Sequence, residues 1–336
     1  MNLNLRRWAL CALLGATLSA SATEYTITTL PGTGGGQSLQ AFGVNNAGQV
    51  VGSINNSAPG SNQQAYIWQA GAFTLLSGPS GALGTSALGI ANNGVVVGSY
   101  YTALVDDGTG TLVPDTVRGF VLDAGTYSTV EVPGADFTQL RGVSPDGRWV
   151  SGYATTAGVN QGFVFDRSTS AFTFLGVAGS QFPLPQGISG SGVVTGSDIF
   201  LPPGGGVPPQ RPAFLFDLAT GTRTDYNFPG WTRAAFRDID ESGQIVGWLS
   251  GVDSAGMPLT TGFIGTPTSW QTLAVAGSNN TTLQGNNDAG WIVGNYALGT
   301  EFYAFVGVPV PEPSTTLMLA AGVAVMLLLR TQRRST

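Results

Sequence analysis

The chain has 336 residues, of which 42% are hydrophobic, only 10% are charged, and 50 are glycine. This composition is typical of turn-rich β structure with enough apolar residues for a core. The chain contains no histidine, no lysine and one cysteine. A Ser-His-Asp triad, a Cys-His dyad, a lysine Schiff base and a histidine zinc site are therefore excluded.

The first 22 residues are typical of a secretory signal peptide. Arg6 and Arg7 precede an apolar run over residues 8–18, and Ala20-Ser21-Ala22 supplies small residues for cleavage before Thr23. The only cysteine, Cys11, lies inside the apolar run behind Leu10, which is too bulky for a lipoprotein signal. The exported part is therefore expected to lack disulfides and thiol chemistry.

A ten-residue glycine phrase recurs through the exported part and organises it. Its clearest copy is GVNNAGQVVG, and the six copies begin at residues 43, 89, 142, 187, 238 and 285. The intervals are 46, 53, 45, 51 and 47 residues, which is the period of a propeller or solenoid. The third copy carries one extra residue, and the fifth begins with Asp238 in place of glycine.

Each repeat predicts four antiparallel strands. The Asn-Asn-Ala-Gly segment suits a tight turn with positive φ at glycine, so one strand enters the phrase and a second leaves it. A third strand follows with an aromatic at its second position, and a fourth alternates in polarity. The aromatic positions are Tyr66, Phe120, Phe163, Phe214, Phe263 and Phe305.

The two ends of the repeat region predict a closed ring. Repeat six stops after Val308 without a fourth strand, whereas residues 25–30 read as an unassigned fourth strand ahead of repeat one. The N-terminal strand would complete the last blade and hide sheet edges. We therefore expect residues 23–308 to form an all-β, six-bladed β-propeller of four-stranded antiparallel blades; an open β array is the alternative.

The C-terminal tail, residues 309–336, has three parts: Pro311-Glu312-Pro313, an uncharged stretch over about 314–329, and a basic end. As a helix, the stretch would span about 24 Å and could cross a locally thinned membrane, with the repeats outside. This order resembles the PEP-CTERM sorting signal. The resemblance implies recognition by an exosortase, transient insertion in the inner membrane, removal of the tail, and delivery to the surface or exopolysaccharide matrix of a Gram-negative bacterium. A simple tail anchor is the alternative.

The repeats resemble the extracellular HAF family, whose units combine an Ile-Asn-x-x-Gly-x-Val-Val-Gly phrase with a His-Ala-Phe strand. The resemblance spans residues 25–308, but no histidine occupies the position before the aromatic pair. It implies an extracellular repeat protein and little about activity.

The exported part is acidic, with 8 basic and 18 acidic residues once the terminal segments are set aside, a net charge of about −10. Such a surface repels nucleic acid and anionic membranes. Two carboxylates could support glycoside hydrolysis, but Asp123, Asp166 and Asp217 sit before turns, where capping is their ordinary role. No catalytic, cofactor or metal residue is assigned.

Two weaker motifs fall on the repeat turn. Asp238 to Gly243 matches the first half of an EF-hand loop, but Leu249 stands where a bidentate acidic ligand belongs. Residues 144–149 resemble a sialidase Asp-box. Both are explained by the repeat itself.

Two insertions lengthen the repeat, at residues 102–117 and 198–212. Both fall between the second and third strands, so they are expected on one face, where repeat proteins often bind partners. Five aromatics could stack on sugars: Tyr100, Tyr101, Trp231, Trp248 and Trp291. The sequence thus favours a non-enzymatic surface or matrix protein that binds extracellular polysaccharide; the alternatives are a carboxylate-dependent glycan hydrolase and a structural spacer.

Overall fold

The computed structural model describes residues 23–32, 37–56, 63–200 and 209–311. The expected signal peptide, the apolar stretch at 314–329, and Glu312 and Pro313 of the sorting motif lie outside these residues. Within the described residues, no helix has the length and hydropathy needed to cross a membrane.

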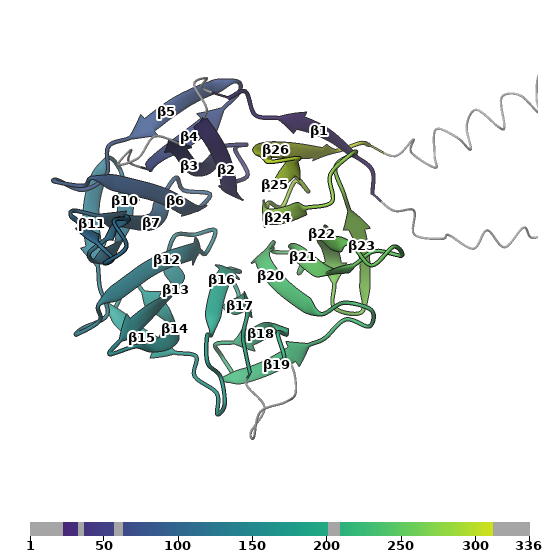
Figure 1. The fold of residues 1–336 in the computed structure, drawn as a ribbon. Helices are drawn as coiled ribbons and strands as arrows, with labels where there is room; N and C mark the ends of the chain where they lie inside the picture. Colours follow the sequence, from purple (N-terminus) through teal and green to yellow (C-terminus); the bar gives the residue numbers. More distant parts are fainter. Residues whose placement is uncertain (1–22, 33–36, 57–62, 201–208, 312–336) are drawn as a thin grey trace, which may run out of the picture.

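The strands are arranged in six repeat units around a central axis (Figure 1). Each unit runs outward from an inner strand to an outer strand, with antiparallel neighbours. The first three units comprise β2 Gln37–Val44, β3 Val50–Asn56, β4 Gln64–Gln69 and β5 Ala72–Leu76; then β6 Gly84–Ile90, β7 Val96–Tyr101, β10 Val117–Asp123 and β11 Thr126–Val130; then β12 Phe137–Val143, β13 Trp149–Thr156, β14 Val159–Asp166 and β15 Ala171–Phe174.

The last three units follow the same plan. They comprise β16 Leu184–Ile188, β17 Val193–Ser197, β18 Ala213–Asp217 and β19 Thr222–Tyr226; then β20 Arg233–Ile239, β21 Ile245–Val252, β22 Pro258–Thr266 and β23 Ser269–Leu273; then β24 Thr281–Asn286, β25 Ile292–Leu298, β26 Glu301–Pro309 and β1 Tyr25–Thr29.

The expectation of six separate four-stranded blades was wrong. Four units are separate four-stranded blades, whereas the second and third units form one continuous eight-stranded sheet. The link is a single parallel pairing of Val117 in β10 with Phe137 in β12. Val117 is the residue at which the first insertion returns to β10.

The predicted ring closure is confirmed. β1 pairs antiparallel with β26, from Tyr25 opposite Pro309 to Thr29 opposite Phe305. The amide of Val310 also donates to the carbonyl oxygen of Glu24 over 2.8 Å. The last unit is therefore built from both ends of the described chain, and the two termini leave the ring side by side (Figure 1).

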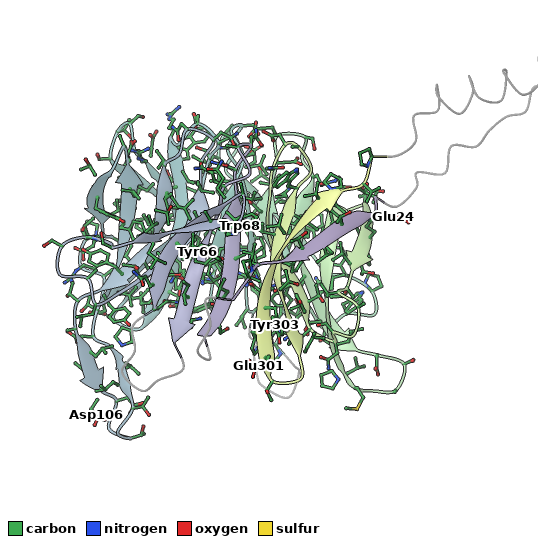
Figure 2. The ribbon with its side chains drawn as sticks, turned by 90° about the horizontal axis from the view of Figure 1, so that it is seen from above. Glu24, Tyr66, Trp68, Asp106, Glu301 and Tyr303 are labelled. Carbon is green, nitrogen blue, oxygen red and sulfur yellow. The ribbon has the colours of Figure 1, made fainter. Side chains whose placement is uncertain are left out.

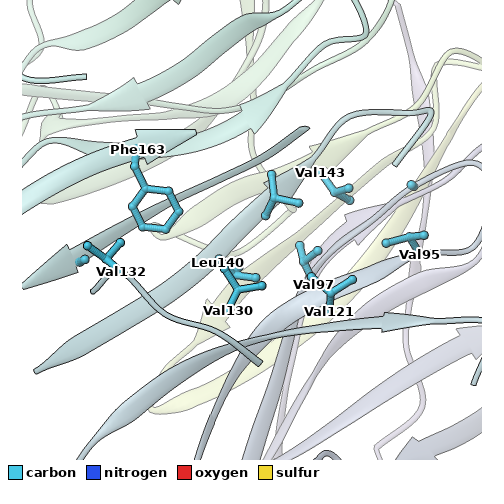
Figure 3. Packing of buried hydrophobic residues seen from close by; sticks show 11 residues of the cluster. Val95, Val97, Val121, Val130, Val132, Leu140, Val143 and Phe163 are labelled. Atoms are coloured by element: carbon cyan, nitrogen blue, oxygen red, sulfur yellow. The ribbon is translucent and has the colours of Figure 1, made fainter. Parts of the chain in front are cut away.

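The hydrophobic core lies between adjacent units. Each buried cluster draws residues from two neighbouring units, as between the second and third, where Val97 and Val121 meet Leu140 and Phe163 (Figure 3). The six aromatics predicted at the second position of the third strand are all 0% exposed. They are therefore core residues in every unit.

The buried aromatic of the third strand explains why the last position of each phrase is glycine. In all six units this glycine pairs in register with the buried aromatic, as Gly52 does with Tyr66 and Gly196 with Phe214. A Cβ at Gly196 would overlap the Phe214 ring and the carbonyl oxygen of Leu184. The position needs glycine because ring and backbone already occupy the space of a side chain.

Candidate functional site

The ring has two unlike faces. Because the strands of each unit alternate in direction, the turns of the glycine phrases lie on one face, here called the phrase face, together with both termini. The loops between second and third strands lie on the opposite face, the loop face. Figure 2 shows Asp106 and Glu301 at the loop face and Glu24 toward the phrase face.

Both insertions leave from the loop face, as predicted. The first contains a small hairpin of β8 Leu104–Asp106 and β9 Leu112–Pro114. The second joins β17 to β18, and its residues 201–208 lie outside the described part. The loop face is therefore opposite the face at which β26 ends at Pro309.

A β-bulge in every inner strand aims one side chain into an axial channel. The register shifts at the residue before the first phrase glycine, as between Leu140 and Gly142 in β12 and between Phe236 and Asp238 in β20. A bulge leaves its extra residue unpaired and re-aims the side chain. The channel-lining residues at this position are Phe42, Leu88, Arg141, Gln186, Arg237 and Gln284.

The first phrase glycines form a tight collar around this channel. A Cβ at Gly142 would overlap the carbonyl oxygen of Gln186, and one at Gly89 would lie 2.9 Å from that of Arg141. At these two positions the neighbouring inner strands approach too closely for a side chain, whereas a Cβ at Gly43 would meet no atom closer than 3.4 Å. Asp238 is the one exception in the collar, and its side chain occupies the space next to Gly187.

Two arginines of the channel have no acidic partner. Among the described residues, no carboxylate lies within 4.0 Å of Arg141 or Arg237. Their Nε atoms are buried without a hydrogen bond, and so is Nε2 of Gln186, a side chain that is 6% exposed. Burial and the neighbouring Arg141 lower the pKa of Arg237 to about 9, and burial lowers the pKa of Arg141.

The phrase-face mouth of the channel is acidic. It is lined by Asp238, Asp240 and Asp288 together with asparagines of the phrase turns. Burial raises the pKa of Asp238 to about 7; amides of Ile239 and Asn286 oppose this shift, and the charges of Asp240 and Asp288 add to it. Within the described part of the chain, no group of three acidic residues is arranged to hold a metal ion.

The half EF-hand motif folds as an ordinary repeat turn. Oδ1 of Asp240 accepts hydrogen bonds from the amides of Ser242 and Gln244 and from the Ser242 hydroxyl. Asn45 and Asn287 bond their own turns in the same way. The side chain that calcium would need is thus committed to its own loop.

A chain of hydrogen bonds links the phrase turns around the mouth. The amide of Glu241 donates to Asp288, the amide of Asp288 to Asn46, and the amide of Asn46 to the side chain of Asn92. The amide of Asn92 then donates to the carbonyl of Pro145. Proline has no N–H with which to continue the pattern.

The aspartates predicted to cap turns do so in part. Asp217 accepts the amides of Ala219 and Thr220, and Asp166 accepts that of Ser168 while pairing with Arg148. Asp123 instead forms an ion pair with Arg167.

The aromatics predicted to stack on sugars are not all accessible. Tyr100 is 6% exposed and bonds Thr129, and Trp291 packs over Gly48 on the phrase face. Another aromatic group, which no repeated sequence pattern indicates, lies at the loop face and consists of half-buried Phe137, Tyr153 and Phe182. The ring centroids of Phe137 and Tyr153 are 5.1 Å apart, and those of Tyr153 and Phe182 are 5.6 Å apart.

Trp248 belongs to the same face but has a different setting. The guanidinium groups of Arg233 and Arg237 lie 5.9 and 6.0 Å from its ring centroid. Cation–π attraction operates at such distances. Trp248 therefore connects a loop-face arginine with a channel arginine.

The ionisation of Asp238 gives a testable pH dependence. The folded protein holds this proton up to about pH 7, whereas the unfolded chain releases it near the ordinary pKa of 3.8. Stability contributed by the protonated carboxyl is thus fully present below pH 3.8 and is lost as the pH rises toward 7. We expect Asp238→Asn to stabilise the protein relative to wild type increasingly from pH 4 to pH 8, measured by urea unfolding. A constant difference across this range would contradict the assignment.

Comparison with known proteins identifies the tail and the fold. The model of the PEP-CTERM protein-sorting motif matches residues 309–334. That motif implies an exported, membrane-anchored precursor that is processed by an exosortase and sorted to the cell surface. Of its Pro-Glu-Pro sequence, only Pro311 is among the described residues, where it is exposed. No curated protein matches the chain.

Several solved structures are similar to the ring. A putative TolB from Agrobacterium tumefaciens is 12% identical, with a TM-score of 0.50, covering 87% of this chain and 100% of that one. A protein of unknown function from Dyadobacter fermentans is 10% identical, with a TM-score of 0.50 and coverage of 84% and 99%. TolB from Acinetobacter baumannii is 15% identical, with a TM-score of 0.47; the match covers 84% of this chain and 66% of that one. At these identities the likeness shows a propeller-like fold alone.

Proposed function

We propose that this protein acts without catalysis as a surface or exopolysaccharide-matrix component of a Gram-negative bacterium, carrying HAF-type repeats, and that it binds polysaccharide with its loop face. The observation that carries the proposal is that the tail begins on one face of the ring and both insertions lie on the opposite face. The sorting tail leaves from the phrase face beside Pro309, whereas both insertions stand on the other face. In the anchored precursor the loop face thus points away from the membrane.

The loop-face aromatics support a carbohydrate as the ligand. Phe137, Tyr153 and Phe182 present adjoining half-buried rings beside the channel. Aromatic faces offer apolar area with little loss of side-chain freedom on binding, and pyranose rings carry matching C–H surfaces. Such a surface binds extended chains without a deep pocket.

The test is binding of the full-length protein, purified in a neutral detergent, to exopolysaccharide from the producing organism. We expect saturable binding, and we expect Phe182→Ala to weaken it roughly three- to tenfold, because an aromatic contact contributes about 0.5–1.5 kcal/mol beyond its buried area. The matched control is Phe174→Ala, a phenylalanine that is 47% exposed on the outer strand β15. No binding by wild type, or equal loss in both variants, would count against the proposal and favour a structural spacer.

One observation favours the hydrolase alternative. The carboxyl of Asp238, with its pKa raised to about 7, lies at the same mouth as Asp240 and Asp288, and a carboxylic acid that is protonated near neutral pH suits general acid catalysis. The mouth is narrow, however, offering about 40 Å³ to the centres of water molecules. One water needs roughly 10–15 Å³ on this measure, so a sugar ring does not fit. Release of reducing ends by wild type but not by Asp238→Asn would establish the hydrolase instead.

A further inference from the structure

We infer that the axial channel contains a binding site for a small oxyanion, held by Arg141, Gln186 and Arg237 and entered from the loop face. The inference does not depend on polysaccharide binding. It starts from the placement of these three residues on consecutive inner strands, β12, β16 and β20, where the bulges aim them at one cavity.

Only half of the arginines in the described residues have a carboxylate partner, and this favours an anion as the partner of the two in the channel. Of the eight arginines in the described residues, four pair with carboxylates: Arg118, Arg148, Arg167 and Arg223. The other four, Arg141, Arg211, Arg233 and Arg237, have no such partner there, although acidic residues outnumber basic ones. Arg141 and Arg237 are half-buried, with fully buried Nε atoms. A charge held partly out of water is costly unless it is paired, so two such arginines in one channel favour a bound counter-ion.

These four arginines are also neighbours in space. The amide of Ala234, next to Arg233, donates to the carbonyl oxygen of Arg211. Arg211 lowers the pKa of Arg233, and Arg141 that of Arg237, in each case as the second cause after burial. Trp248 contacts both Arg233 and Arg237. The four arginines therefore form a continuous positively charged strip, from Arg211 and Arg233 at the loop face to Arg237 and Arg141 in the channel.

The donors in the channel match an oxyanion. Buried Nε atoms of Arg141 and Arg237 and the buried amide nitrogen of Gln186 have no hydrogen-bond acceptor. Guanidinium groups bind carboxylate, sulfate or phosphate oxygens through paired N–H donors. Asp238 lines the same cavity but lies beyond ion-pair distance of both arginines.

The size of the cavity limits the ligand. It offers about 40 Å³ to the centres of water molecules, which is room for a few waters or one small ion. Phe42 and Leu88 line the other side of the cavity and supply no charge. The site thus takes a single oxyanionic group, either as a free ion or as the carboxylate of a sugar acid whose ring remains outside the cavity.

Calorimetric titration of the full-length protein in neutral detergent tests this site. Sodium sulfate is the free-ion probe, galacturonate carries a carboxylate on a sugar, and glucose is the neutral control. We expect saturable binding of one sulfate, with at least a tenfold loss in Arg141→Gln and in Arg237→Gln. Arg148→Gln, which removes an exposed and already paired arginine, should bind as wild type does. Binding of galacturonate with the same arginine dependence would assign a sugar acid as the source of the anion; binding of sulfate alone would assign a free ion.

Two results would overturn the inference. The first is no saturable heat with either anion, and the second is binding that both channel variants retain. Should a glutamine variant fail to fold, a selenate soak of wild-type crystals gives an independent answer, because the anomalous selenium signal must appear between Arg141 and Arg237. An empty channel at saturating selenate contradicts the site.

Discussion

Replacing Asp198 by alanine is expected to lower the free energy of unfolding by about 3 kcal/mol, because it removes a buried acceptor of three hydrogen bonds and leaves Arg223 with Asp225, whose side chain is 38% exposed, as its remaining ionic partner. Asp198 and Arg223 pair over 2.7 Å, and their side chains are 0% and 4% exposed. The Arg223 guanidinium also lies 4.2 Å from the ring centroid of buried Phe214, so its position is fixed by packing as well as by charge. Asp198 also accepts the amides of Phe182 and Ile199, and alanine leaves these donors unsatisfied.

Urea unfolding of the full-length protein in detergent, followed by tryptophan fluorescence, measures this loss. The matched control is Glu131→Ala, which breaks the ion pair with Arg118, where the side chains are 47% and 33% exposed. Exposed pairs contribute at most about 1 kcal/mol. Similar losses in the two variants would show that burial does not set the strength of the Asp198 pair.

Replacing Gly98 by alanine is expected to cost about 3 kcal/mol or more, through overlap and not through backbone conformation. A Cβ at Gly98 would overlap the carbonyl oxygen of Ser86 and lie 2.9 Å from its carbonyl carbon. Both atoms belong to the bulged inner strand β6, whose Gly89 lies against the backbone of Arg141 and Gly142 in the next inner strand, so β6 has little room to shift. Gly98 also pairs with buried Phe120, so displacement of the strand disturbs the core.

The control for this prediction is Gly176→Ala. No atom comes within 4 Å of a Cβ at Gly176, and its φ lies outside the left-handed region. This substitution should leave stability within about 0.5 kcal/mol of wild type or raise it by up to about 1 kcal/mol, because alanine restricts the unfolded chain. Thermal unfolding of the Gly98→Ala and Gly176→Ala variants measures the two changes in stability. Equal changes would contradict the idea that overlap with the Ser86 carbonyl destabilises Gly98→Ala.

The sequence was informative wherever the repeat imposed one requirement on every unit. The glycine spacing and the aromatic third strand predicted four strands per unit, and the orphan strand at residues 25–30 predicted closure against β26, which is confirmed. These features can be predicted from local sequence: glycines mark the turns, alternating polarity marks the strands, and a first strand and a last repeat that are each incomplete indicate that they pair. The prediction of six separate blades failed because of one pairing between units, Val117 with Phe137, which no repeated feature of the sequence specifies.

The candidate channel site escaped the sequence analysis for a different reason. Phe42, Leu88, Arg141, Gln186, Arg237 and Gln284 share a position before the phrase glycine, yet no pattern of polarity marks them. The regular alternation of side chains along a strand does not predict that the residue before the phrase glycine faces the axis. Only the β-bulge directs its side chain into the channel. The one usable signal was variability: the position holds four residue types in six copies, beside a glycine that five of the six copies share.

The pairing of β1 with β26 also determines when the molecule can finish folding. Tyr25 meets Pro309 across nearly the whole described chain, so the last unit stays incomplete until the final strand has been made. Until β1 pairs with it, β26 has an unpaired edge, and loop closure over this distance is slow compared with the local hairpins of the other units. Because the sorting tail begins at residue 309, the ring closes at the point where the chain meets its anchor. Premature loss of residues 25–29 would thus leave an open sheet edge beside the membrane, poised to pair with another copy.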